Sequence, residues 1–514
     1  MKNKLYTELI FLLLIGAITS LSLPPLNFFF INFFTFTLFF VFLVKKSKLH
    51  SNQKIFFFYG WTFGLGYFIS NLYWISISLT FDSSFKFLIP LSIILIPMFL
   101  AVFYGAVSFL FIFFKQKKII NSFLLFSLSF GIIEFLRGTF LTGFPWNLIA
   151  YSFSNQLEVL SITSIIGTYG FNLFCISLFT SPAIILLNKR KQDFGIFIFF
   201  LSITFVFFYY GSIEKNKFLK LKKNNIDYEI RAIGSNISLE RFYSNDDPVS
   251  VINELIKISE PNKSKKIIFV WPEGIVPSIS QDDLIEYSWL FDKKFNKNHI
   301  FLIGINKEED VGGITKYYNS LSVYDNKLNL INSYSKIKLV PFGEFLPLEN
   351  FLRSFGLRSI TNSYQSYTSG NKRNVINLDL DMFSIKFLPL ICYEIIYSGK
   401  LFHKTDFDLI INISEDGWFG QSIGPKQHFA HSIFRAIESG KYLIRSSNNG
   451  ITAIINPIGI IEQKLSLGKT GFVKLKEVRT IQPTIFSKYG NKIFGLLILL
   501  YIFLIFSFNR TRDE

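Results

Sequence analysis

The chain has 514 residues, of which half are hydrophobic and 64 are Phe, and it is long enough for two or three domains. A mean hydropathy of +0.36 excludes an ordinary soluble protein and predicts membrane spans. The two cysteines, Cys175 and Cys392, do not indicate a disulfide framework, and the net charge of +17 favours basic cytoplasmic loops and anionic lipid over a nucleic-acid partner.

Eight apolar runs are predicted to cross the membrane, because a span needs about 20 residues. These runs cover residues 5–21, 25–44, 55–79, 87–114, 119–136, 157–187, 194–212 and 493–508. The first is predicted to be an uncleaved span, since it lacks a good signal-peptide cleavage site and further runs follow at once. We therefore expect a membrane domain with seven helices at 1–212, an extramembrane domain at 213–492, and an eighth helix with a cytoplasmic tail at 493–514.

Basic clusters follow every second apolar run, and the N-terminus is basic as well. The clusters lie at residues 45–48, 115–118, 189–191 and 510–512. Because Lys and Arg accumulate in cytoplasmic loops, both termini are predicted to be cytoplasmic. The segment between the seventh and eighth runs, residues 213–492, then lies on the opposite face of the membrane.

Polar residues near the outer end of the fifth run indicate a second role for that region. Glu134 and Arg137 are spaced to pair on one helix face, and ionisable groups at this depth are costly and often functional. We expect a structural or substrate-lining role for the pair. Trp146, in Phe144-Pro145-Trp146-Asn147, is either an interfacial anchor or a substrate contact.

Residues 213–492 alternate short β-like runs with helix-compatible segments, which predicts a layered α/β domain. The expected strands lie at 228–233, 266–271, 299–305, 319–325, 384–391, 409–413 and 451–455. The expected helices lie at 248–259, 282–297 and 427–439.

Three stretches of this domain each place a reactive side chain at the end of a strand. Glu273 comes after Ile267–Trp271 and Pro272, and Lys336 and Lys338 lie in a stretch that ends at Glu344. Cys392 ends an apolar strand at a strand-to-helix turn, where helix N–H groups favour a thiolate; the alternative is a small buried hydrophobe. Together they predict a cysteine that attacks a carbonyl, a carboxylate that takes its proton, and an ammonium that stabilises the oxyanion.

Cofactor and metal signatures are missing from the sequence. The histidines and cysteines show no metal-ligand spacing, and no phosphate-binding or dinucleotide glycine motif occurs at a strand-to-helix junction. We therefore expect neither a metal nor a cofactor.

The three stretches resemble the three signatures of the nitrilase superfamily with its Glu-Lys-Cys triad. They are Trp271-Pro272-Glu273, Tyr334-x-Lys336 through Pro341-Phe342-Gly343-Glu344, and Cys392-Tyr393-Glu394. The flanking spans make the chain similar to the apolipoprotein N-acyltransferase branch of bacterial inner membranes. The resemblance implies a nitrilase-like αββα sandwich beside about eight transmembrane helices.

The resemblance also implies roles for individual residues. Glu273 is the expected general base, Lys336 the oxyanion stabiliser with Lys338 as second choice, and Cys392 the nucleophile. Supporting roles fall to Glu344, Tyr393 and Glu394, and substrate-binding roles to Tyr243, Trp418, His428 and Trp146. One departure is Glu415-Asp416-Gly417 before Trp418, where the family commonly has Asn-Asp-Ala.

The implied reaction is a ping-pong acyl transfer through a Cys392 thioester. The expected donor is a phospholipid, with phosphatidylethanolamine as the preferred candidate, and the acceptor is the α-amine of the diacylglyceryl-cysteine that begins an apolipoprotein. The Phe-rich spans and residues 351–367 are expected to frame a lateral entrance for both lipids.

Two alternatives use the same residues. A membrane-bound nitrilase-type amidase would hydrolyse a small C–N substrate, but a tether needs one span rather than eight. A degenerate nitrilase-like domain would act as a binding module, and the intact triad argues against it.

Overall fold

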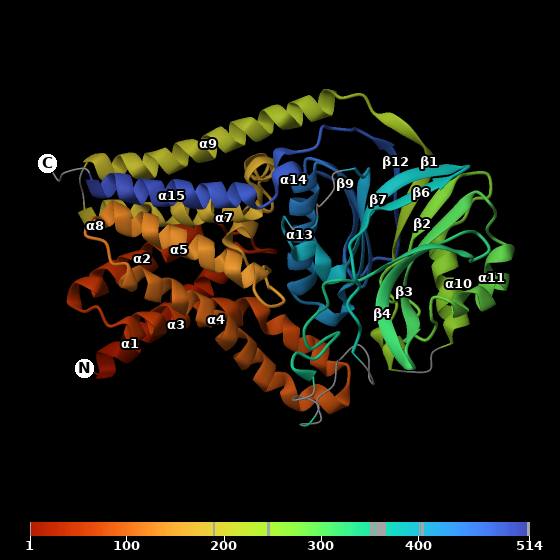
Figure 1. The fold of residues 1–514 in the computed structure, drawn as a ribbon, viewed down its shortest axis with the longest axis horizontal. Coiled ribbons are helices and arrows are strands. Elements are labelled where there is room, and N and C mark those ends of the chain that lie inside the picture. The colour runs from red at the N-terminus through yellow and green to blue at the C-terminus, as the bar shows by residue number, and fades with distance from the viewer. Residues whose placement is uncertain are drawn as a thin grey trace.

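A computed structural model describes residues 2–188, 191–243, 247–349, 366–399 and 406–510, together with Ser354 and Leu401. The chain forms two parts, a bundle of long helices and a domain built on two β-sheets, which Figure 1 shows side by side. We call them the helical domain and the sheet domain.

The helical domain contains the long apolar helices from both ends of the chain. They are α1 (Lys2–Thr19), α2 (Ile31–Leu49), α3 (Gln53–Leu72), α4 (Ile89–Phe113), α5 (Ile119–Thr139), α7 (Thr163–Thr180), α8 (Pro182–Asn188), α9 (Lys191–Lys220) and α15 (Lys492–Arg510), with the short α6 (Leu157–Leu160). Four 3₁₀ segments join them: η1 (Ser20–Ser22), η2 (Tyr73–Thr80), η3 (Ser83–Leu88) and η4 (Ile149–Phe153). All eight predicted runs coincide with helices of this bundle.

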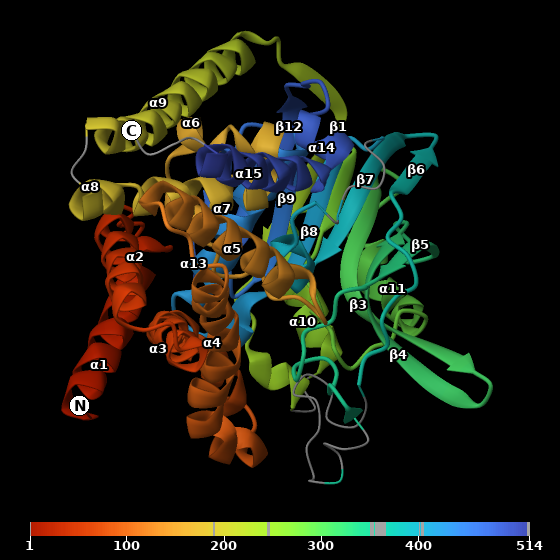
Figure 2. The same cartoon turned by 60° about the vertical axis from the view of Figure 1, so that its left-hand side comes forward.

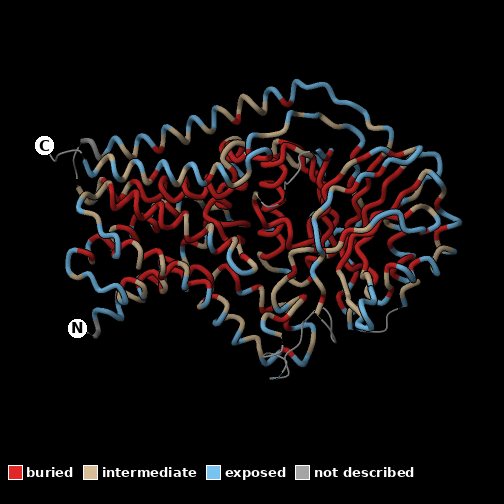
Figure 3. The backbone as a smooth tube through the Cα atoms, in the orientation of Figure 1, coloured by how far each residue is buried: buried red, intermediate tan, exposed pale blue. Residues whose placement is uncertain are grey.

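Six helical segments among the described residues are long and apolar enough to cross a membrane. They include α1, α4, α5, α7 with α8, α9 and α15. The predicted spans at α2 and α3 are also helices, but α2 ends in a lysine-rich turn and both pack inside the bundle. The segments of α5 and α7 are mostly buried, whereas α9 and α15 have few buried residues (Figure 3), as lipid-facing helices do.

The sheet domain holds two six-stranded sheets within the described residues, in the orders β12-β1-β2-β3-β4-β5 and β11-β10-β9-β8-β7-β6. The first sheet comprises β1 (Asn224–Gly234), β2 (Ile267–Val270), β3 (His299–Val311), β4 (Ile314–Tyr324), β5 (Leu330–Ser335) and β12 (Gly471–Val478). The second comprises β6 (Ile376–Leu380), β7 (Phe383–Ile391), β8 (Leu409–Glu415), β9 (Tyr442–Asn448), β10 (Thr452–Ile455) and β11 (Ile461–Leu465).

Each sheet has a parallel centre and antiparallel edges. Strands β1, β2 and β3 run parallel, as do β7, β8 and β9. The sheets face each other, and Ser446 of β9 donates across to the carbonyls of Ile233 (2.8 Å) and Val270 (2.9 Å). Parallel strands buried on both faces explain the continuous apolar runs that predicted them.

Helices cover both outer faces, which completes the expected four-layer sandwich (Figure 2). The first sheet is covered by α10 (Pro248–Ser259) and α11 (Ser288–Asp292), and the second by α13 (Gly424–Ser439). Helix α10 begins where Asp247 accepts a hydrogen bond from the Val249 N–H at 3.1 Å. Short 3₁₀ turns, η5 (Leu239–Phe242), η6 (Asp283–Tyr287), η7 (Cys392–Ile396) and η8 (Asp416–Phe419), follow or join the strands.

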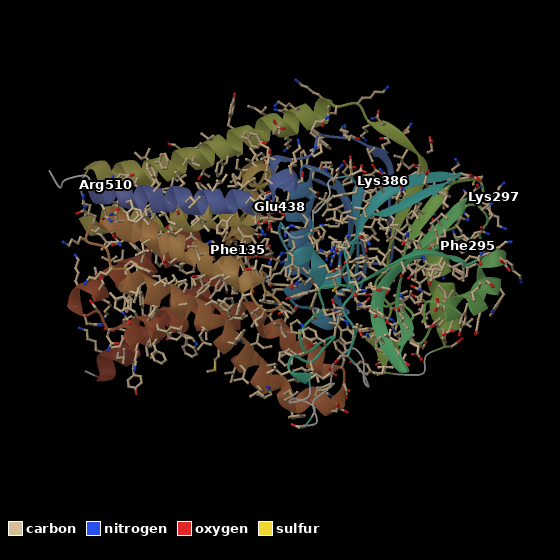
Figure 4. All side chains as sticks on the ribbon, in the orientation of Figure 1. Phe135, Phe295, Lys297, Lys386, Glu438 and Arg510 are labelled. Carbon is tan, nitrogen blue, oxygen red and sulfur yellow. The ribbon has the colours of Figure 1, made fainter. Side chains whose placement is uncertain are left out.

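Helix α13 lies between the second sheet and the helical domain. Glu438 on α13 is placed at this junction in Figure 4, where it accepts hydrogen bonds from the Thr168 N–H (2.7 Å) and hydroxyl (2.6 Å) of α7. It also pairs with Arg435 at 2.8 Å and accepts from Ser398 at 2.6 Å. The two domains are therefore joined by a buried polar contact, and the chain returns through α14 (Ile485–Tyr489) into α15.

Both described ends of the chain lie at the same end of the bundle, away from the sheets (Figure 1). At that end Lys46 pairs with Glu8, and Lys115 donates to the Ser47 carbonyl, so the first two basic clusters lie together. The other two clusters, at 189–191 and 510–512, fall largely outside the described residues.

Candidate active site

Glu273 lies in the turn that follows β2, as Pro272 predicts, and its side chain is buried. Gly304 on the neighbouring strand β3 allows the close approach, since a Cβ there would meet the Glu273 Cα at 2.4 Å. One carboxylate oxygen, Oε2, accepts the Glu415 backbone N–H at 2.8 Å. The other, Oε1, accepts from Asn319 at 2.7 Å and Lys336 at 3.1 Å.

Lys336 follows β5 and is buried between two carboxylates. Its Nζ donates to Glu273 Oε1 at 3.1 Å and to Glu344 Oε1 at 2.9 Å. Burial alone would lower the pKa of the Lys336 ammonium, but the two carboxylates more than offset it and hold that pKa well above its ordinary value. The lysine is therefore a fixed cation in the site.

Glu344 completes this group. Its Oε2 accepts the Val340 N–H at 2.8 Å, and its Oε1 accepts from Lys336 and, at 2.8 Å, from Asn319. Burial raises the pKa of the Glu344 carboxyl, and the nearby Glu273 carboxylate adds to the effect, whereas Lys336 opposes it. Two carboxylates thus share one ammonium.

Cys392 occupies the turn between β7 and η7 with a left-handed backbone, φ +46°. Such a conformation costs a residue with a side chain about 1–3 kcal/mol and recurs at functional turns. Burial raises the pKa of the Cys392 thiol well above its ordinary value, Glu273 raises it further, and Lys336 opposes the rise.

This protonation differs from our expectation for the strand-to-helix turn. The sequence suggested helix N–H groups that favour a thiolate, but Cys392 begins only a five-residue 3₁₀ turn. The desolvation of the buried sulfur is the larger effect. Burial therefore favours the thiol form of Cys392, and its ionisation would need a base that takes the proton.

Glu394 ties the turn of Cys392 to the turn of Lys336. Its fully buried carboxylate accepts both the Tyr334 hydroxyl (2.8 Å) and the guanidinium of Arg373. It also accepts three backbone N–H groups, from Ile337 (3.1 Å), Lys338 (3.2 Å) and Ile391 (2.9 Å). A single side chain therefore sets the distance between two of the three predicted catalytic residues.

His428 contacts the backbone of the Cys392 turn. Its Nδ1 is 2.8 Å from Asp416 Oδ1, and its Nε2 is 3.3 Å from the Cys392 carbonyl oxygen. Arg445 donates to both Asp416 oxygens, at 2.9 and 2.8 Å. Burial and the Arg445 guanidinium lower the pKa of His428. This buried cluster supports the backbone of the cysteine turn.

Tyr393 connects the cysteine turn to the helical domain. Its hydroxyl donates to the Gly143 carbonyl at 3.0 Å, and that of Tyr397 donates to Thr142 at 2.9 Å. The accepting loop follows α5, where the predicted ion pair is present: Arg137 Nε donates to Glu134 at 2.7 Å. Arg137 also donates to the Phe144 carbonyl, so the pair holds the loop on which the cysteine turn rests.

Trp146 is buried at the junction of the two domains and is not an interfacial anchor. Its Nε1 donates to Gln427 Oε1 at 2.9 Å, and its ring stacks on His428 with centroids 5.2 Å apart. It contacts the cysteine turn through His428.

Tyr243 and Trp418 lie together at a different edge of the site. The Trp418 ring is 6.5 Å from Tyr243, 5.2 Å from Phe242 and 5.8 Å from Phe81 of the helical domain. We call these four residues the aromatic group. Both domains contribute to it.

Two other predicted features lie away from the groups described above. The Lys338 ammonium lies 5.7 Å from the centre of the Tyr397 ring, away from the carboxylates that hold Lys336. Most of the expected entrance at 351–367 lies outside the described residues, which include only Ser354, Ser366 and Tyr367 of it.

Sequence reasoning missed several groups of the site. The side chain of Asn319 donates to both Glu273 and Glu344, and its backbone carbonyl accepts the Lys336 N–H at 2.8 Å. Its place on β4 is the only feature of the sequence that could have indicated this role. Arg373 and Arg241 reach their buried carboxylates from distant segments. Among the described residues, no group of His, Cys, Asp and Glu side chains is arranged to hold a metal ion.

Two family models match most of the helical domain and most of the sheet domain. Residues 15–181 match the apolipoprotein N-acyltransferase N-terminal domain, and residues 251–482 match the carbon-nitrogen hydrolase family. The second match contains all three signature stretches.

Curated relatives match nearly end to end. The chain is 32% identical over 515 residues to an apolipoprotein N-acyltransferase of Rickettsia prowazekii, covering 99% of this chain and 100% of that protein. It is 30% identical over 477 residues to one of Brucella suis, covering 89% and 87%. Saccharomyces cerevisiae Nit3, of the nitrilase superfamily, is a similar solved structure, with 17% identity, a TM-score of 0.33, and coverage of 49% of this chain and 90% of Nit3.

Proposed function

Since the chain belongs to the apolipoprotein N-acyltransferase family, we propose that it moves a fatty acyl chain from a phospholipid to an apolipoprotein by way of Cys392. The acceptor is the α-amine of the N-terminal diacylglyceryl-cysteine, and the product is a triacylated lipoprotein. The observation that most supports this proposal is that a buried carboxylate, a buried ammonium and a cysteine with a strained backbone lie together near the junction with the helical domain.

The first half-reaction loads the acyl chain onto the enzyme. Glu273 takes the proton of the Cys392 thiol, and the sulfur attacks the ester carbonyl of the phospholipid. The negative charge that develops on the carbonyl oxygen is stabilised by the Lys336 ammonium. The ester C–O bond then breaks, the leaving oxygen takes the proton from Glu273, and lysophospholipid departs from the thioester.

The second half-reaction transfers the acyl chain to the amine. The uncharged α-amine attacks the thioester carbonyl, and the same cation stabilises the second oxyanion. Glu273 takes the proton of the amine and returns it to the departing Cys392 sulfur. An amide forms, the thiol is restored, and no cofactor is consumed.

A membrane location suits both substrates. Donor and acceptor carry acyl chains, and removing such chains from a bilayer costs about 0.8 kcal/mol for each CH₂ group. The helical domain supplies the loop that carries the cysteine turn, and Phe81 of the aromatic group. These contacts support an active site at the membrane surface, where both lipids can enter without full extraction.

The decisive experiment is intact-mass analysis of the purified full chain with phospholipid. Incubation with phosphatidylethanolamine is expected to add the mass of one acyl chain, and a diacylated lipopeptide is expected to remove it. We propose phosphatidylethanolamine as the preferred donor, as the family resemblance implies. Faster loading from phosphatidylglycerol would overturn that preference, and no adduct from either lipid would overturn the acyltransferase proposal.

We also propose that both termini are cytoplasmic and that residues 213–492 form a periplasmic catalytic domain, with 1–212 and 493–514 as the membrane part. Both described ends and the first two basic clusters lie at the end of the bundle away from the sheets, which supports this orientation (Figure 1).

Thiol labelling tests the orientation. Lys265→Cys, exposed on the sheet domain, is expected to react with a membrane-impermeant maleimide in intact spheroplasts. Lys48→Cys, exposed at the other end of the bundle, is expected to react only after the membrane is permeabilised. Both native cysteines are buried and provide a low background. Labelling of the Lys48 variant in intact spheroplasts would reverse the proposed topology.

A further inference from the structure

The departure at Glu415 coincides with a buried ion pair that the reaction scheme leaves unused. Arg241 NH2 lies 2.5 Å from Glu415 Oε2, and each side chain is only 1% exposed. A buried pair is costly to desolvate and often adds little stability, so its presence in an active site calls for another role.

The backbone of Glu415 contacts the candidate base, Glu273, and its side chain forms the ion pair with Arg241. Its N–H donates to Glu273 Oε2 at 2.8 Å. Its carboxylate accepts from Asn448 at 2.6 Å and from the Gly417 N–H at 2.9 Å, as well as from Arg241. The residue therefore has no freedom to move relative to Glu273.

Arg241 also donates hydrogen bonds to three backbone carbonyls. Its Nε donates to Ile275, two residues after the base, at 3.1 Å. Its NH1 donates to Ser238 at 2.7 Å and to Ile237 at 3.3 Å. The bond to Ile275 attaches η5 (Leu239–Phe242) to the turn that carries Glu273, and the other two bonds stabilise the segment that leads into η5.

The segment that Arg241 holds carries two members of the aromatic group. The guanidinium carbon lies 4.6 Å from the centre of the Phe242 ring, and Tyr243 follows directly. The Phe242 ring lies against Gly274, next to the base, and 5.2 Å from Trp418. Moving Arg241 would therefore move apolar side chains that lie next to the Glu273 turn.

We propose that the Arg241–Glu415 pair is a positioning device that fixes the aromatic group relative to Glu273 and thereby sets the affinity for the acyl chain of the phospholipid. This inference rests on the proposed acyltransferase function. It assigns a role to the Glu415 departure, because a neutral Asn at that position could not neutralise the buried guanidinium.

The test compares Arg241→Met with a matched variant at a second buried pair. Arg231 is also buried and pairs with Glu229 at 2.5 Å, and both residues lie on β1, outside the aromatic group. We expect Arg241→Met to raise the KM for phosphatidylethanolamine about tenfold. The kcat, calculated per enzyme molecule whose Cys392 can be acylated, should change less than about threefold. Arg231→Met is expected to lower the unfolding temperature with an unchanged KM.

The double variant Arg241→Met with Glu415→Gln separates positioning from folding. Removing both charges avoids a buried unpaired carboxylate, so its unfolding temperature should be closer to that of the wild type than for Arg241→Met alone. The KM should stay raised, because the bonds to Ile275 and Ser238 are still missing.

The outcomes are distinct. An unchanged KM in Arg241→Met, or an equal rise in Arg231→Met, would overturn the positioning role while leaving acyl transfer intact. If both the KM and the unfolding temperature of the double variant return to wild-type values, the positioning role is also overturned. A wild type that forms no acyl-enzyme would overturn the proposed function, and this inference with it.

Discussion

Replacing Cys392 by Ala is expected to abolish the acyl-enzyme and to slow acyl transfer on the order of 10⁴-fold or more. In the proposed mechanism the sulfur holds the acyl chain between the two half-reactions, and Ala offers no substitute. Intact-mass analysis with phosphatidylethanolamine reports the first half-reaction, and transfer of a labelled chain to a diacylated lipopeptide reports both.

Cys175→Ala is the matched control, because the chain has only one other cysteine. Cys175 is buried in α7 of the helical domain. Its replacement removes a sulfur of the same kind from a core position, and activity is expected to stay within about twofold of the wild type. Acyl loading in Cys392→Ala, or its loss in Cys175→Ala, would contradict the assignment of the nucleophile.

Replacing Lys336 by Met is expected to lower kcat about 10²–10³-fold. Two effects combine. The oxyanion loses its cation, and Glu273 and Glu344 are left to share a buried site without a positive charge. Like charges in such a site raise the pKa of one carboxyl, so a proton is bound at neutral pH and the base is blocked.

The second effect predicts a pH dependence that the first does not. Raising the pH from about 6 to about 9 should ionise both carboxylates of Lys336→Met and recover part of the activity, whereas the lost cation is not replaced. The measurement is the rate of acyl-enzyme formation across this range. Lys338→Met is the control, since its ammonium lies over Tyr397, and we expect less than about a threefold change. Similar losses in both variants would refute the choice of Lys336.

The fold could be predicted wherever the pattern along the chain is local. Eight apolar runs predicted the helices of the bundle, and the segment 248–259 coincides with α10. Strand β9 was missed because Arg445, Ser446, Ser447 and Asn448 make its end polar. These residues are nevertheless fully buried, because the facing sheet and the cluster around Asp416 bond their polar atoms. Only the folded chain supplies such partners.

The predicted catalytic residues were recognisable because each follows a strand within a signature stretch. Their surroundings were not. Asn319 reaches two carboxylates, and Arg241 reaches Glu415 across 174 positions of sequence. Hydrogen bonds between such distant segments leave no periodic trace in the sequence, so nothing local indicates them.

By itself the sequence determined the membrane class, the layered α/β domain, the family resemblance and the three residues on which the chemistry is proposed to depend. The tertiary structure alone decided that the pKa of the Cys392 thiol is raised, because that pKa depends on how completely the fold removes water around the sulfur. It also decided that the loop after α5 supports the cysteine turn and that His428 contacts the backbone of that turn. Composition and spacing record which groups are present, whereas burial and long-range contacts set their charge and their orientation.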